Sequence, residues 1–217
     1  RLSLPDAASA SGSKTMSVML GSLCAFLRCA FDTPAVRTAK VDSLQLAVII
    51  PKEVAGPALK DVWQHIAELL PGLLAAADAS YEEANAPIVP TLVLQHIVEA
   101  NDDDTRNAIK EYVFAGYLDA ELDPTDPYRP AGQPKGFDPN NALPPDAPLR
   151  IRLIKGLTST NYNLKRVIGD LLYGLCSDNA EEFVRLTGLG SAAGVLQEKD
   201  LLGAFQHLGT TQTIDAS

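Results

Sequence analysis

Aromatic residues are scarce in this sequence, and no convincing segment alternates apolar and polar residues as a half-buried strand does. Only 6% of the 217 residues are aromatic, whereas leucine and alanine are abundant. Aromatic and β-branched residues favour strands, while leucine and alanine favour helices, so the composition argues against a β-sandwich. We therefore predict an all-α protein.

Cysteine and positive charge are also in short supply. Cys24, Cys29 and Cys176 form no C-x-x-C pair and no even-numbered disulfide framework, which favours a reducing, cytoplasmic location. The chain carries 27 acidic and 18 basic residues, a net charge of −9. This balance argues against nucleic acid as a main partner, because phosphate binding requires clustered cations.

Long hydrophobic runs are absent as well. The most apolar stretch, Met16–Phe31, is shorter than the roughly 20 residues of a bilayer span, and Arg28 interrupts it. It also starts too late and lacks the flanking residues of a typical signal peptide. We therefore predict a buried helix here and no membrane span.

Apolar residues recur with helical spacing along the chain. Thr33 and Pro34 predict an N-cap followed by proline in the first turn, and Pro57 predicts the start of another helix that Pro71 and Gly72 stop or kink. The further helices predicted from this periodicity are 88–100, 106–118, 149–157, 164–176 and 180–186.

One segment interrupts this pattern. Residues 123–148 contain eight prolines, which exclude a helix or an interior strand. We predict an inserted surface loop that separates a helical segment, 1–122, from C-terminal helices, 149–217, of the same architecture. A proline-rich ligand at 127–130 is a weaker alternative, because such spacing is common by chance.

The glycines near position 190 resemble a dinucleotide-binding loop. Gly188, Gly190 and Ala193 have the spacing G-x-G-x-x-A. That motif binds a pyrophosphate only as a turn from a strand into a helix, and no strand precedes it here. We predict a helix end instead, with Gly188 or Gly190 supplying the cap and Ser191 capping the next helix.

No group of residues predicts catalysis or metal binding. His65 and His96 each precede a glutamate by three residues, which we interpret as two surface helix pairs, because the further glutamates of a di-iron site are missing. The three cysteines lie on predicted apolar helix faces, where thiols are usually structural. Asp102 to Asp104 lack the glycine of a calcium loop and are typical of a helix start. We expect no enzyme, cofactor or metal.

A candidate binding stripe lies on the predicted helix 164–176. Arg166, Asp170 and Tyr173 are spaced i, i+4, i+7 on the face opposite the apolar residues. Such a stripe is usually a solvated surface, but it contacts partners when the helix lines the wall of a helical solenoid.

Residues 149–203 resemble the C-terminal part of the synembryn family. Leu189 and Ser191 depart from the aromatic residue and the asparagine that are usual in that family. The positions that match are Leu149-Arg150, Leu153, Leu157, Leu164-Lys165, Leu171-Leu172, Leu175-Cys176, Phe183, Gly188, Gly190, Ala192-Ala193-Gly194 and Leu201-Leu202-Gly203.

The resemblance implies an armadillo/HEAT-like superhelix that binds the α subunit of heterotrimeric G proteins. It also implies a guanine-nucleotide exchange factor and folding chaperone that stabilises the nucleotide-free subunit, with no cofactor of its own. On this interpretation the stripe of Arg166, Asp170 and Tyr173 contacts the partner, and we expect a cytoplasmic monomer. The alternative is an armadillo-type adaptor that binds a peptide or a helix and has no G-protein role.

Overall fold

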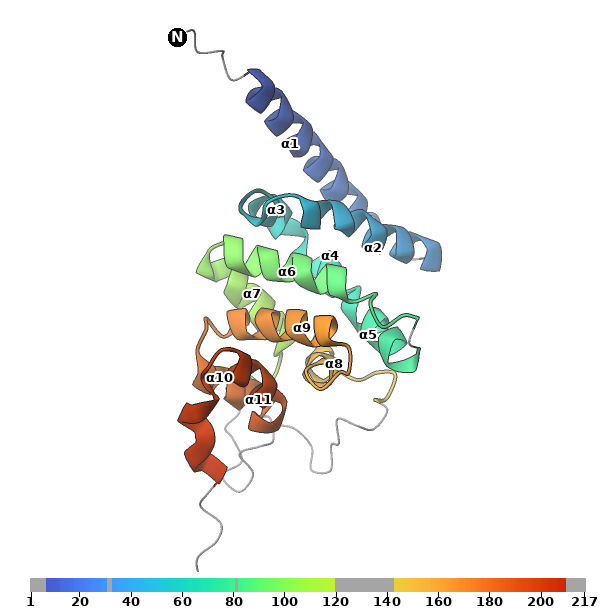
Figure 1. Cartoon of the computed structure of the whole chain (residues 1–217). Helices are drawn as coiled ribbons and strands as arrows, with labels where there is room; N and C mark the ends of the chain where they lie inside the picture. Colours follow the sequence, from blue (N-terminus) through green and yellow to red (C-terminus); the bar gives the residue numbers. More distant parts are fainter. Residues whose placement is uncertain (1–6, 31–32, 81, 120–142, 210–217) are drawn as a thin grey trace, which may run out of the picture.

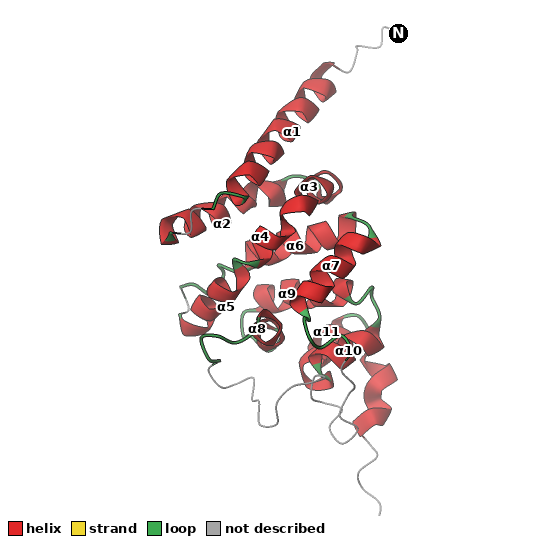
Figure 2. Ribbon diagram, turned by 180° about the vertical axis from the view of Figure 1, so that it is seen from behind, coloured by secondary structure: helices red, strands yellow, loops and turns green. Residues whose placement is uncertain are grey.

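A computed structural model describes residues 7–30, 33–80, 82–119 and 143–209 of the chain. These residues form helices joined by turns and loops, and no strand occurs among them (Figure 2). The predicted all-α class is confirmed. None of the described helices combines the length and apolar character that a bilayer span requires.

Most of the helices follow one another with short connections, whereas residues 114–148 separate α7 from α8. In chain order they are α1 (Ala7–Leu27), α2 (Pro34–Ile49), α3 (Lys52–Leu59), the 3-10 turn η1 (Lys60–Val62), α4 (Trp63–Ala67), α5 (Leu70–Ala79), α6 (Ile88–Ala100), α7 (Asp103–Val113), α8 (Leu149–Gly156), α9 (Tyr162–Leu175), α10 (Ala180–Thr187), α11 (Leu189–Glu198) and the 3-10 segment η2 (Leu202–Gly209).

Helix α6 lies at the centre of the stack. It packs against α2 and α3 on one side and against α9 on the other, so α2, α6 and α9 form successive levels (Figure 1). The contact between α3 and α6 is close: a Cβ added to Gly56 would lie 2.7 Å from the carbonyl oxygen of His96. Only glycine allows the two backbones to approach this far.

The predicted helix starts are confirmed where a cap was recognised. The Thr33 hydroxyl accepts a hydrogen bond from the Val36 amide at the start of α2, and the Asp102 carboxylate accepts one from the Thr105 amide at the start of α7. Capping satisfies amides that have no partner inside the helix, which explains why these signals are dependable.

The prediction that Pro57 begins a helix is wrong. Helix α3 already starts at Lys52, and Pro57 lies inside it. A proline in this position donates no amide hydrogen bond, and the helix gives way to the tighter η1 turn three residues later. Pro71, in contrast, occupies the first turn of α5, so the predicted interruption there is confirmed.

A buried arginine joins three parts of the C-terminal half. Arg150 of α8 is 1% exposed, and its Nε and Nη2 atoms donate to the carbonyl oxygen of Leu186, at 3.3 and 2.9 Å. Its guanidinium lies 4.0 Å from the ring centre of Tyr117. Burial lowers the pKa of Arg150 to about 10, so the side chain stays charged at neutral pH.

The proline-rich segment 123–148 lies largely outside the described residues. Its last six residues, 143–148, contain no helix, and Pro148 is the N-cap of α8. The buried side chain of Arg152 donates to the carbonyl oxygens of Pro144, Pro145 and Ala147, at 2.7 to 3.1 Å. Two neighbouring arginines of α8 therefore fix backbone on both sides of that helix.

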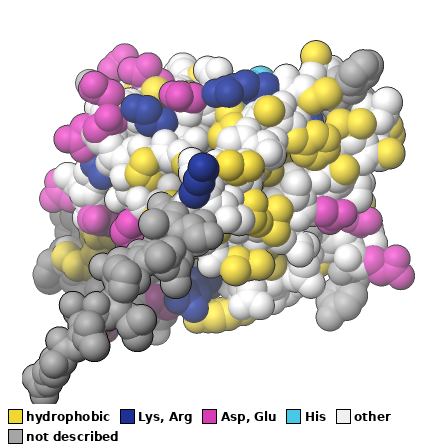
Figure 3. All heavy atoms as spheres, turned by 90° about the horizontal axis from the view of Figure 1, so that it is seen from above, with side chains coloured by type: hydrophobic (Ala, Val, Ile, Leu, Met, Phe, Trp, Pro, Cys, Tyr) yellow, Lys and Arg dark blue, Asp and Glu magenta, His cyan; other side chains and the backbone are white. Residues whose placement is uncertain are grey.

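One end of the stack presents apolar side chains. Helix α1 points away from the rest of the molecule (Figure 1). Its C-terminal half packs on the core through Leu20, Leu23 and Leu27. Figure 3 looks onto this end and shows hydrophobic side chains spread over it. This end consists of α1, α2 and α3. The large exposed hydrophobic residues described on these three helices are Val18, Met19, Leu46, Ile49 and Val54.

The single tryptophan lies in the middle of the stack. Trp63, at the start of α4, is half-buried, and its ring meets that of Tyr112 of α7 edge-on, with 5.5 Å between the ring centres. This contact joins two helices that are far apart in sequence.

Gly188 connects α10 to α11 with φ +81°. Its amide donates to the carbonyl oxygen of Val184 at 2.7 Å, which ends α10. Gly190 and Ser191 lie inside α11, so the prediction that Ser191 caps this helix is wrong, and the cap glycine is Gly188. This one residue is enough to turn the chain between the two helices, because glycine adopts positive φ without strain.

We predict opposite effects for two glycine substitutions in this turn. Gly188→Val should lower the free energy of unfolding by about 1–3 kcal/mol, because a β-branched residue is strained at positive φ. Gly190→Ala is the control: an added Cβ there meets no atom within 4 Å, and alanine should stabilise α11 by about 0.4–1 kcal/mol. Urea unfolding of the two variants measures both; equal losses would contradict the assignment of the cap.

Candidate interaction surface

Helix α9 is fixed at its N-terminus by one asparagine. The Asn161 side-chain oxygen accepts from the Leu164 amide at 3.2 Å, while its amide group donates to the Ala84 carbonyl oxygen and to Asn85, at 3.0 and 2.9 Å. The cap therefore also ties α9 to the segment before α6. The residues that α9 buries are Leu164, Ile168, Gly169, Leu171, Leu172, Tyr173 and Leu175.

The three predicted site residues differ in exposure. Arg166 is exposed, with 63% of its side chain accessible, and Asp170 is half-buried at 30%. Their ion pair is loose, with 3.9 Å between Arg166 Nε and an Asp170 carboxylate oxygen. Tyr173 is only 7% exposed, so the prediction that it lies on the exposed face is wrong.

Tyr173 is buried because two segments beyond α9 fold over its ring. Phe183 of α10 packs edge-on against it, with 5.6 Å between the ring centres, and the ammonium of Lys199 lies 4.8 Å from the ring centre. Its hydroxyl donates to the Asp178 carbonyl oxygen at 2.7 Å. Burial, with a smaller effect of the Asp178 carboxylate, raises the pKa of Tyr173. Periodicity within α9 could not reveal these contacts.

The turn held by the Tyr173 hydroxyl has unusual backbone geometry. Ser177 and Asp178 both adopt positive φ, +52° and +58°. Such a conformation costs of order 1 kcal/mol for a residue other than glycine and persists only where the surroundings fix it. Asn179 then caps α10 by accepting from the Glu182 amide at 3.0 Å. The turn is therefore a rigid edge of the surface beside α9.

Asp170 and Tyr173 line a hollow of about 460 Å³ between the C-terminal ends of α6 and α9, which we call the α6–α9 hollow. Lys199 Nζ lies 3.0 Å from Asp170, and Lys52 Nζ lies 2.6 Å from Glu99. The residues that line it are Lys52, Val98, Glu99, Arg106, Asp170, Tyr173, Gly174, Ser177, Asp178 and Lys199.

The α6–α9 hollow contains equal numbers of cationic and anionic side chains. Such a surface offers hydrogen-bond donors and acceptors to a protein partner and does not favour a strongly charged small molecule. The sequence did not reveal Lys52, Glu99 and Lys199 as neighbours of α9, because they come from α3, α6 and the end of α11. Only the stacking of helices brings them together.

The two predicted His/Glu pairs differ in whether they form. His65 and Glu68 form the predicted surface pair, at 3.6 Å. The pair predicted between His96 and Glu99 is not formed, because Glu99 binds Lys52 and Gln95 instead. Among the described residues, no group of three or more His, Cys, Asp or Glu side chains is placed to hold a metal ion.

The cysteines divide into two classes. Cys24 and Cys176 are buried, as predicted, and burial raises the pKa of both thiols, that of Cys176 to about 12. Cys29 lies beyond the end of α1 and is partly exposed, so the prediction that it lies on an apolar helix face is wrong.

The C-terminal part of the chain is similar to a known protein family. Residues 133–216 match the family described as guanine nucleotide exchange factor synembryn. These residues are similar to that family, and we call them the synembryn-like segment. The family resemblance of the sequence is thereby confirmed.

Individual relatives of this segment are proteins named Chaperone Ric-8A. Those of Mus musculus and Bos taurus are 37% identical over 61 residues, and that of Gallus gallus is 31% identical over 61 residues. The alignment covers 28% of this chain and 12% of the mouse protein, so the chain spans about an eighth of its length. Arg166, Asp170 and Lys199 lie in the synembryn-like segment, whereas Lys52 and Glu99 of the hollow lie outside it.

We predict that three substitutions on α9 change the free energy of unfolding by amounts that reflect whether the replaced side chain is buried or exposed. Tyr173→Ala should lower the free energy of unfolding by about 3 kcal/mol or more, because it removes a buried ring. Tyr173→Phe should cost about 0.5–1.5 kcal/mol through the lost hydrogen bond to Asp178, and Arg166→Ala should stay within about 0.5 kcal/mol. Urea unfolding measures all three; a neutral Tyr173→Ala would show that the ring is exposed.

We predict that the three thiols differ in reactivity. Because the thiolate is the reactive form, Cys29 should react first with a disulfide reagent at pH 8, and Cys176 should react only after the protein unfolds. Time courses of the reagent, with Cys29→Ser as the control that removes the fast phase, measure this order. A fast phase that survives in Cys29→Ser would contradict it.

Proposed function

We propose that this chain binds a G-protein α subunit and acts as a guanine-nucleotide exchange factor and folding chaperone. The observation that carries the proposal is the synembryn-family match over residues 133–216, which contains α9 and the part of the α6–α9 hollow around Asp170 and Lys199. The relatives of this segment bear the name of a chaperone, which supports the second activity.

The physical basis of such exchange is linkage. A protein that binds the empty, loosened α subunit more tightly than the nucleotide-bound one lowers nucleotide affinity by the same factor. The exchange factor then needs no covalent chemistry, and we infer that this chain is not an enzyme in that sense. Its task is to present a rigid, complementary surface, and the mixed charges of the hollow next to Arg166 offer one.

We also infer that the helices form an armadillo-like superhelix. Helix α3, the broken helix α4–α5 and α6 make one triplet, and α7, α8 and α9 make the next. Helix α5 packs against α8, and α6 packs against α9, so equivalent helices of the two triplets are neighbours. Stacked repeats of this kind expose long surfaces that bind proteins. Three free thiols fit a reducing cytoplasm, where we place the protein as a monomer.

A second candidate is an adaptor of the same architecture that binds a peptide or a helix and has no G-protein role. The α6–α9 hollow favours the adaptor, because a hollow between stacked helices suits a polypeptide segment. The two candidates differ in whether nucleotide exchange on a G protein changes.

The deciding measurement is the release of a fluorescent GDP analogue from a purified G-protein α subunit. The chain should speed this release, and Arg166→Glu should slow the catalysed release by about threefold or more, because one interface charge is reversed. The control is Lys14→Glu, an exposed change of equal charge on α1. Unchanged GDP release with a folded chain would support the adaptor, and equal losses in both variants would contradict the role of α9.

A further inference from the structure

The ring of His96 has a nitrogen atom without a hydrogen-bond partner where α6 packs against α3. This atom, Nδ1, is buried, and no atom of the described residues forms a hydrogen bond with it. The backbone carbonyl oxygen of His96 lies beside Gly56, where the two helices approach closely. A neutral imidazole can leave one acceptor nitrogen unpaired, whereas both nitrogens of an imidazolium carry a proton that needs an acceptor. The surroundings of this nitrogen therefore suit the neutral ring.

The carboxylate one helical turn further along α6 is already occupied. One oxygen of Glu99 accepts from the Lys52 ammonium at 2.6 Å, and the other accepts from the Gln95 side-chain amide at 2.7 Å. The Lys52–Glu99 pair joins the start of α3 to the end of α6, and both residues line the α6–α9 hollow. A protonated His96 would have to compete with Lys52 or Gln95 for this carboxylate.

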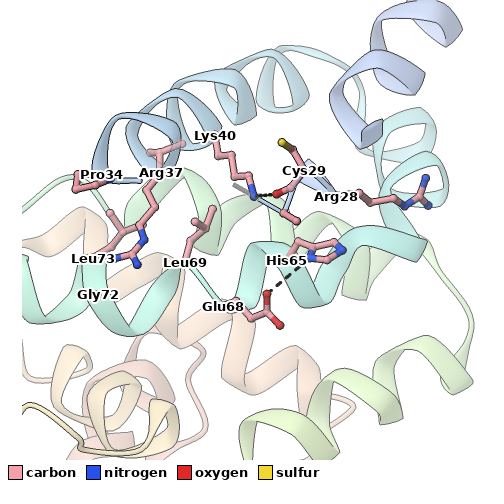
Figure 4. A pocket seen from close by; sticks show the side chains of 12 residues that line it. Arg28, Cys29, Pro34, Arg37, Lys40, His65, Glu68, Leu69, Gly72 and Leu73 are labelled. Carbon is pink, nitrogen blue, oxygen red and sulfur yellow. Dashed lines mark hydrogen bonds and ion pairs between the residues drawn. The ribbon is translucent and has the colours of Figure 1, made fainter. Parts of the chain in front are cut away.

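His65 has the opposite arrangement. Its Nδ1 atom lies 3.6 Å from a carboxylate oxygen of Glu68, and 38% of its side chain is exposed. The two residues lie at the wall of a separate pocket that shares no residue with the α6–α9 hollow (Figure 4). A proton on His65 meets an acceptor without any rearrangement of helices, so His65 is a matched comparison for His96.

The charged groups that act on the His96 ring come from α3 and α6. They are Lys52 and Glu53 at the start of α3 and Glu99 on α6. Of the described residues of α2, α4, α7 and α9, which also pack on α6, none is among these groups. Burial lowers the pKa of His96 below its ordinary 6.5, against the effect of Glu99 and together with that of Lys52. The folded chain then binds fewer protons than the unfolded chain, so it loses stability as the pH falls below 6.5.

We propose that His96 makes the packing of α3 on α6 sensitive to pH, and that protonation of its ring loosens the Lys52–Glu99 wall of the α6–α9 hollow. If the imidazolium displaces Lys52 from Glu99, the ion pair between the two helices is lost. If it displaces Gln95, His96 and Lys52 share one carboxylate and repel each other. A partner that contacts this wall is then held less tightly in acid. The inference concerns the stability of the wall and does not depend on the exchange function.

The first test is a proton NMR titration of the histidine rings in the whole 217-residue chain. The signal of His96 is the one that remains in both His65→Gln and His207→Gln. Its midpoint should lie below pH 6.5. A midpoint at or above this value would overturn the proposal, because the fold would then stabilise the imidazolium.

The second test compares urea unfolding of the unmodified chain and of His96→Gln between pH 7.5 and pH 5.5. The unfolding constant of the unmodified chain should rise relative to that of the variant by up to about tenfold per pH unit below 6.5, the limit for one proton. The control, His65→Gln, should keep this rise. Parallel pH profiles for the unmodified chain and His96→Gln would contradict the proposal. The NMR titration decides it without His96→Gln if that variant does not fold.

The third test locates the change by amide hydrogen exchange and mass spectrometry. After correction for intrinsic exchange rates, peptides from α3 should lose more protection between pH 7.5 and pH 5.5 in the unmodified chain than in His96→Gln. Peptides from α10, at the opposite end of the stack (Figure 1), should show no such difference. An equal difference in α3 and α10 would show that the whole molecule responds, and would overturn the assignment to the Lys52–Glu99 wall.

Discussion

The buried guanidinium of Arg150 is the constraint on which the C-terminal half depends. A charge removed from water must be surrounded by hydrogen-bond acceptors, so the backbone around Leu186 and the ring of Tyr117 cannot move away from it without a large cost. That fixes α8 between the end of α7 and the end of α10. Helix α9 packs against α7, α8 and α10. The position of α9, and with it one wall of the α6–α9 hollow, therefore depends on this unit.

Most of the fold could be predicted from local sequence signals. Capping side chains such as Thr33 and Asp102 act within four residues, so their effect is visible in the sequence. Pro57 was misleading because tertiary packing of α3 on α6 outweighs the cost of a proline inside a short helix. Gly188 was recognisable as a cap candidate, but only the backbone geometry distinguishes it from Gly190.

The candidate site was less predictable, for a reason that Tyr173 illustrates. Helical periodicity places a side chain on a face of its own helix but does not say what else covers that face. Here α10 and Lys199 cover the tyrosine, while Arg166 two turns earlier stays exposed. The arginines of α8 escaped notice similarly, because a charged residue in an amphipathic pattern is normally read as solvent-exposed.

Trp63 confines the tryptophan fluorescence of the molecule to one region. It is the only indole of the chain and contacts Tyr112 at the junction of α4 and α7, while no tryptophan lies near α8 to α11. Intrinsic fluorescence therefore reports the middle of the stack, whereas the far-ultraviolet circular dichroism signal sums over every helix. In a stack whose parts contact only their neighbours, the fluorescence and circular dichroism signals need not change together during unfolding. Different denaturation midpoints for the two signals would show that the middle of the stack unfolds separately from other helices.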